Sequence, residues 1–272
     1  MSTTSTVATS VSIHAAPARD GDETVLPVLN GRGALVPFHS RTRGDHAHVT
    51  LIDTMAGPLG GDEITIDATV SAGARLRVDS AGCALALAGP NGGTATHDTR
   101  ITVGDEAELC WSPEPVIAAA GSDLIMRNSV TLAPKARLLL RDVQVLGRAE
   151  ESPGKLATCL TVARSGKPIL DQELLFGAGN PTWSSPVVLA DHRATGNLLY
   201  VSPELSEVMC APFLLSNSPG SGHAMVTPLA ESAVLVTAAA PDARRVNTLL
   251  EEGHQRIHET LDSGIMTGLT NM

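Results

Sequence analysis

Aromatic side chains are nearly missing from this sequence. Only 2% of its 272 residues are Phe, Trp or Tyr, although 43% are hydrophobic. A core of useful size must therefore be built from Ala, Val, Leu and Ile, and the length suits one large β domain or two ordinary ones. No stretch approaches 18 uninterrupted apolar residues, so the sequence predicts no transmembrane helix.

Paired cysteines and targeting signals are also missing. Cys83, Cys110, Cys159 and Cys210 are scattered and form no CxxC pair, which argues against a disulfide framework and against a structural zinc site. We expect buried, reduced thiols, because free cysteine is often buried. The N-terminus lacks the charged and apolar regions of a secretory signal. These features predict a cytoplasmic protein.

Basic residues are fewer than acidic residues in this sequence. The sequence has 19 basic and 29 acidic residues, for a formal net charge of −10. Nucleic-acid phosphates and anionic membrane surfaces both attract basic faces. The charge balance therefore argues against either of them as a partner.

What the sequence does contain is a pattern that recurs three times, at intervals of roughly 30 residues. Each copy has an apolar residue, a short turn, an Ala and a second apolar residue at fixed offsets, in Val70–Leu76, Val103–Leu109 and Leu132–Leu138. Alternating residues flank each copy, as in strand–turn–strand units. Such a unit cannot bury its apolar face alone, so we expect stacked copies in a large, mainly all-β scaffold.

The alternation also predicts which residues form the core. Glu63–Val70 is the clearest amphipathic strand, with apolar and polar residues on opposite faces. The expected core positions lie on the apolar side of the repeat strands: Ile64, Ile66, Val70, Leu76, Val103, Leu109, Leu132 and Leu138. Residues 1–22 are rich in Ser, Thr and Ala, and we interpret them as a loose arm with at most an edge strand near Ser10–His14.

Helical signals are confined to the C-terminal part, where we expect about two helices. Ser202 and Pro203 predict the start of a short helix that runs to about Cys210. A longer helix is predicted over residues 242–262, where apolar residues recur at helical spacing. Between the strands Ala157–Arg164 and Pro168–Leu174, Ser165-Gly166-Lys167 predicts a hairpin turn.

No motif in the sequence indicates a catalytic site. His254 and His258 lie four residues apart on the expected helix, as in helical metal sites, but two ligands alone do not close a site. Acids at strand ends and turns are solvated by default, and no pair of them has the context of an acid–base dyad. We therefore predict no catalytic residues and leave any metal ligand unassigned.

The order of several segments resembles the UreD/UreH family of urease accessory proteins. The resemblance covers roughly residues 46–176, and its motifs follow one another as His48–Leu51, Gly57–Asp62, Ile64–Ile66, Ala72–Ala74, Val103–Leu109, Trp111–Ile117, Leu132–Leu138 and Val145–Arg148. No single motif decides the matter, but the ordered set is specific. The resemblance implies that residues 23–272 form one UreD-like β domain that includes the C-terminal helix.

The resemblance also implies a function. Members of this family act as non-enzymatic scaffolds in the nickel-dependent maturation of apo-urease, together with UreF and UreG. We therefore expect UreF-like and UreG-like partners, apo-urease itself, no tightly bound cofactor and only transient nickel. Asp62, Glu114 and Asp142 are the acids expected to shape a partner surface or a metal path. The alternative is a β-sandwich or jelly-roll enzyme whose site is assembled from scattered residues.

Overall fold

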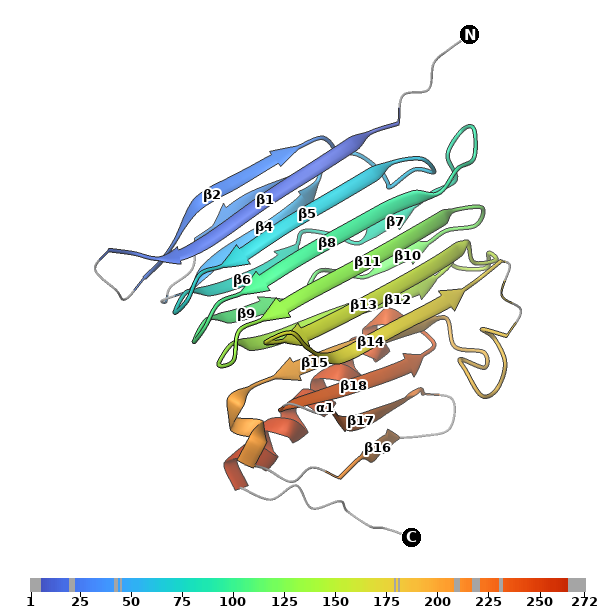
Figure 1. Ribbon diagram of the computed structural model, residues 1–272. Coiled ribbons are helices and arrows are strands. Elements are labelled where there is room, and N and C mark those ends of the chain that lie inside the picture. The colour runs from blue at the N-terminus through green and yellow to red at the C-terminus, as the bar shows by residue number, and fades with distance from the viewer. Residues whose placement is uncertain are drawn as a thin grey trace.

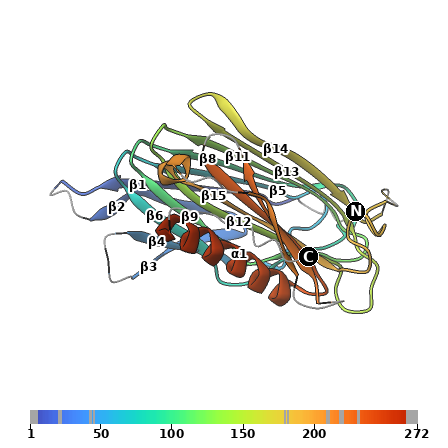
Figure 2. The same cartoon turned by 90° about the horizontal axis from the view of Figure 1, so that it is seen from below.

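Two β-sheets lie face to face, and a single long helix covers part of the outer face of one of them (Figures 1 and 2). The structure is a computed structural model that describes residues 6–19, 23–41, 44, 46–178, 180, 182–207, 211–216, 221–229 and 232–263. The mainly β architecture expected from the sequence is confirmed.

Sheet A has seven strands, five of which are parallel neighbours. Antiparallel strands, β14 and β2, close its two edges. In spatial order the strands are β14 (Lys167–Phe176), β13 (Lys155–Arg164), β11 (Asp123–Leu132), β8 (Ala95–Val103), β5 (Glu63–Val70), β1 (Ala8–Pro17) and β2 (Thr24–Arg32).

Sheet B has eleven strands, and its middle is also parallel. The main path is β16 (Phe213–Ser216), β17 (His223–Leu229), β18 (Ala233–Ala240), β15 (Ala194–Val201), β12 (Arg137–Leu146), β9 (Glu108–Trp111), β6 (Arg75–Ser80), β4 (Ala47–Asp53) and β3 (Leu35–Ser40). Two short strands, β10 (Val116–Ala118) and β7 (Ala84–Ala86), continue the sheet beside β12.

The threefold sequence pattern forms the turns that carry the chain from sheet A to sheet B. Equivalent positions of the copies are cross-strand partners: Val70 pairs with Val103, and Leu76 pairs with Leu109. The third copy continues both rows through Leu132 and Leu138. The chain therefore winds as a solenoid, and the sequence repeat is the repeat of its coils.

The conserved spacing within each turn has a steric reason. The alanines Ala74, Ala107 and Ala136 are each 0% exposed, and each donates its N–H to the carbonyl three residues earlier, at 3.0–3.2 Å. All three alanines belong to the core between the sheets, so a larger side chain at this position would have to displace core neighbours. The turn sequence thus fixes both the corner and the register between coils.

The core between the sheets matches the prediction. All eight core positions named from the repeat strands are buried, with exposed fractions between 0% and 8%. The hairpin at Ser165 and Gly166 is confirmed as well, with φ of 51° and 78° that suit a two-residue turn. The expected burial of the thiols is wrong for Cys83, which is exposed, and for Cys110 and Cys159, which are only half-buried. Cys210 lies outside the described residues.

The N-terminal segment differs from the loose arm that was expected over residues 1–22. Within it, β1 is an inner strand of sheet A, parallel to β5 and antiparallel to β2. Val11, Ile13 and Ala15 point into the core and are at most 2% exposed. Ser12 and His14 alternate with these residues, so the segment is an ordinary alternating strand, and without β1 the apolar strand β5 would be an open edge.

Helix α1 (Ala243–Ser263) packs on the outer face of sheet B, against β12, β15, β17 and β18 (Figure 2). Its apolar side, which includes Val246, Leu249 and Leu250, forms a second core with that face. Gly253 is required for this contact, because a Cβ there would lie 2.6 Å from a methyl of Val236. The shorter helix is a 3-10 turn, η1 (Pro203–Glu207).

Candidate functional site

Sheet B is interrupted beside the middle of β12, and the interruption opens a cavity. Arg137–Leu140 pair with β9 and Gln144–Leu146 pair with β10, so Arg141–Val143 have no strand partner on that side. Ser112–Pro115 leave the sheet there, since the two prolines of this segment cannot donate to a ladder. Sheet B separates the space between the two sheets from solvent, and at this point it has a gap.

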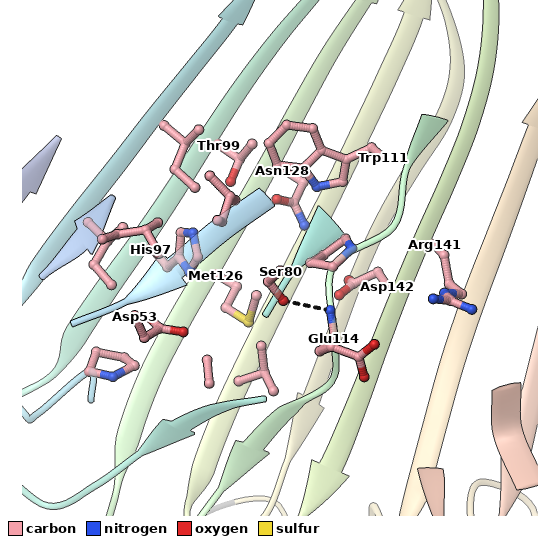
Figure 3. A pocket seen from close by; sticks show the side chains of 18 of the residues that line it. Asp53, Ser80, His97, Thr99, Trp111, Glu114, Met126, Asn128, Arg141 and Asp142 are labelled. Atoms are coloured by element: carbon pink, nitrogen blue, oxygen red, sulfur yellow. Dashed lines mark hydrogen bonds between the residues drawn. The ribbon is translucent and has the colours of Figure 1, made fainter. Parts of the chain in front are cut away.

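The cavity lies behind this break and extends between the sheets (Figure 3). Its volume is about 70 Å³, which is room for a few water molecules or for a hydrated cation. Asp53 and Glu114 are exposed at its mouth, where the Glu114 N–H donates to Ser80 Oγ at 2.9 Å. The mouth therefore carries two carboxylates that solvent can reach.

Further in, a carboxylate from one sheet and an imidazole from the other line the cavity. Asp142 lies on β12 and is 8% exposed, while His97 lies on β8 of the opposite sheet. The Nε2 atom of His97 is buried and has no hydrogen-bond partner among the described residues. Asn128 of β11 adds an amide to the same wall.

Burial changes the ionisation of both groups. It raises the pKa of Asp142 from 3.8 to about 6, although the amide of Gln144 opposes the rise. It lowers the pKa of His97 from 6.5 to about 4, although the charge of Asp98 opposes the fall. At neutral pH the cavity therefore holds a carboxylate and a neutral imidazole, the forms in which both residues bind divalent cations.

A row of polar side chains continues from the cavity toward the far side of the intersheet space. Asn197 is the cross-strand partner of Asp142, and Thr237 is the next partner along sheet B. Asn197 donates to Gln172 Oε1 across the two sheets at 2.9 Å and accepts from Thr237 Oγ1 at 3.1 Å. Thr237 is exposed, so this polar row reaches the surface again.

Two of the three acids chosen from the sequence meet at this site. Glu114 and Asp142 both line the cavity. Asp62 lies elsewhere, at the turn before β5, where its carboxylate accepts the N–H groups of Val7 at 2.8 Å and Leu59 at 2.9 Å. Asp62 therefore caps the turn and anchors the chain just before β1.

Sequence reasoning missed His97, Asn128 and Asp53. They come from three different coils, so no local spacing connects them. One signal was available in the sequence. His97 and Asp142 lie at inward-facing positions of alternating strands, where the pattern calls for apolar residues. A polar residue on the inward face of a core strand is costly unless it has a role.

Comparison with known proteins identifies the family. The family model described as UreD urease accessory protein matches residues 10–264. This chain belongs to the UreD family of urease accessory proteins. It is 49% identical over 229 residues to the urease accessory protein UreD of Streptomyces coelicolor, which covers 84% of this chain and 88% of that one.

Two further UreD proteins are similar over most of their length. UreD 2 of Saccharopolyspora erythraea is 45% identical over 240 residues, which are 87% of this chain and 83% of that protein. UreD 3 of Streptomyces griseus is 44% identical over 247 residues, which are 89% and 93% of the two chains. Among the described residues of this UreD-family chain, no helix is long and apolar enough to cross a membrane.

The cap at Asp62 can be tested by its effect on stability. We expect Asp62→Ala to lower the free energy of unfolding by about 1–3 kcal/mol, because two partly buried N–H groups lose their acceptor. Chemical denaturation measures the change, with the exposed Asp67→Ala as the matched control. A stability equal to that of the control would contradict a capping role.

Proposed function

We propose that this chain is a non-enzymatic scaffold in the nickel-dependent maturation of apo-urease, and that it works in the cytoplasm with UreF-like and UreG-like proteins. The family and the printed names of its relatives support the urease connection. The observation that carries the nickel role is the open cavity, whose lining includes the carboxylates of Asp53, Glu114 and Asp142 and a neutral imidazole.

These residues suit Ni²⁺ as a cargo in transit. Imidazole and carboxylate both bind nickel, and neither is the soft thiolate that would retain it. A conducting site must bind well enough to admit an ion and weakly enough to release it. The exposed acids Asp53 and Glu114 at the mouth would attract the cation, and Asp142 with His97 would receive it inside.

The partner role is tested by co-purification. The full chain is co-expressed with the UreF-like, UreG-like and apo-urease proteins of one gene cluster, and each component is isolated in turn. We expect the chain to be recovered with the UreF-like protein and with apo-urease. Recovery of the chain free of both, in every isolation, would contradict the scaffold.

The metal path is tested by a carboxylate at its mouth. At limiting nickel, we expect Glu114→Ala to lower the nickel content of co-expressed urease several-fold, because one of two cation-attracting groups is lost. Glu173→Ala, which removes an exposed carboxylate of β14 away from the cavity, is the control. Equal nickel contents for the two variants would contradict a path through this mouth, while the scaffold could still stand on the co-purification result.

A further inference from the structure

The histidine pair of helix α1 has a geometry that the sequence could not show. The Nε2 atoms of His254 and His258 lie 3.0 Å apart. Their rings meet nearly edge to face, with centroids 4.5 Å apart and planes at 78°. Spacing alone places both rings on one face of the helix, but it does not bring the two ring nitrogens together.

Packing holds the two rings in place. The ring of Tyr200, on β15, lies 5.5 Å from the ring of His254 and 5.3 Å from that of His258. The side chain of His254 is only 17% exposed, whereas His258 is exposed. The His254 ring is therefore packed against the sheet, and the neighbouring His258 side chain is exposed.

An acidic side chain lies beside the more buried ring of the pair. The Glu251 carboxylate lies 3.9 Å from Nδ1, the other ring nitrogen of His254. A carboxylate on that side is the usual partner of a metal-binding imidazole.

We infer that His254 and His258 form a bidentate surface site for a divalent transition-metal ion. A cation about 2.1 Å from both nitrogens would subtend an angle of about 90° over a 3.0 Å separation, whereas tetrahedral zinc needs a wider angle. A right angle is that of square-planar or octahedral ions such as Ni²⁺ and Cu²⁺. Two protein ligands leave the remaining positions to water or to a partner's side chains.

This site is separate from the intersheet cavity. Tyr200 and α1 lie on the outer face of sheet B, while Asp142 and His97 lie between the sheets. The inference therefore goes beyond the proposed function and does not depend on it. It adds a place on the surface where a metal ion can be held before or after contact with another protein.

The test is calorimetric titration of the untagged full chain with Ni²⁺ alone. Compared with the unchanged chain, we expect His254→Ala and His258→Ala each to weaken one binding event about tenfold or more, because each removes half of a chelate. His39→Ala, an exposed histidine of β3, is the matched control and should leave that event unchanged. Zn²⁺ should bind this pair more weakly than Ni²⁺.

A second variant separates this site from the cavity. Asp142→Asn should leave the Ni²⁺ event of the histidine pair intact. The inference is overturned if both helix variants bind Ni²⁺ as tightly as the His39→Ala control does. It is equally overturned if the event disappears in Asp142→Asn and persists in His258→Ala, whose exposed side chain can be removed without loss of the fold.

Discussion

Asp142→Asn is expected to make the protein more stable at neutral pH and less able to load urease with nickel. Burial raises the pKa of Asp142 to about 6, so the folded chain holds this proton more tightly than the unfolded chain does. Ionisation therefore costs stability as the pH rises from about 4 to about 6. Asparagine has a similar shape and cannot ionise, so it avoids this cost.

The size and pH dependence of the effect follow from the shifted pKa. Relative to the unchanged chain, the stability of Asp142→Asn should grow by about 2 kcal/mol between pH 4 and pH 7.5. Chemical denaturation at both values measures the change, and Asp171→Asn, an exposed aspartate of β14, is the control. A stability difference that does not change with pH would contradict the burial of a charged carboxylate.

The same variant links stability to function. If Asp142 carries nickel, urease produced with the more stable variant should contain several-fold less of it. Groups kept at an energetic cost to the fold are typical of functional sites. A variant that is both more stable and fully active would mean that Asp142 has no part in the metal path.

Leu109→Ala is expected to give the largest loss of stability, about 2–5 kcal/mol. Leu109 is 0% exposed and lies in the middle coil, between Leu76 and Leu138. Hydrogen-bonded coils on both sides hold the strands about 4.8 Å apart, so the cavity left by the missing side chain cannot collapse. Because each coil packs on the coils next to it, the loss of packing in one coil also destabilises the adjacent coils.

A leucine with the opposite environment provides the control. Leu175 of β14 is 50% exposed, and Leu175→Ala should change stability little. The denaturation midpoints of the two variants are compared with that of the unchanged chain. If Leu109→Ala unfolds at the same denaturant concentration as Leu175→Ala, the assignment of the core face is contradicted.

The solenoid was predictable because its corners are local. An Ala between two apolar residues at fixed offsets is visible in the sequence, and the same residues become cross-strand partners. Strand β1 was not predictable in the same way. Its outward face carries Ser10, Ser12 and His14, and its place inside the sheet depends on pairing with β2 and β5, which the sequence does not state.

Only part of the cavity lining could be identified from the sequence. Glu114 lies in a family motif and Asp142 was chosen as an acid at a strand end or turn, and both line the cavity. His97 was missed because it reaches the site from another coil, and Asp62 was grouped with them although it caps the turn before β5 and does not line the cavity. The histidine pair was visible, but the 3.0 Å distance that makes it informative depends on how Tyr200 packs against α1.

Under the proposed function, urease receives its nickel with the help of this chain. The most direct measurement is the nickel content of urease purified from cells with a complete urease gene cluster, with this gene deleted and then restored. Deletion is expected to abolish both the nickel content and the activity of urease, and restoration is expected to return both. Urease that contains its full nickel without this chain would contradict the proposed function.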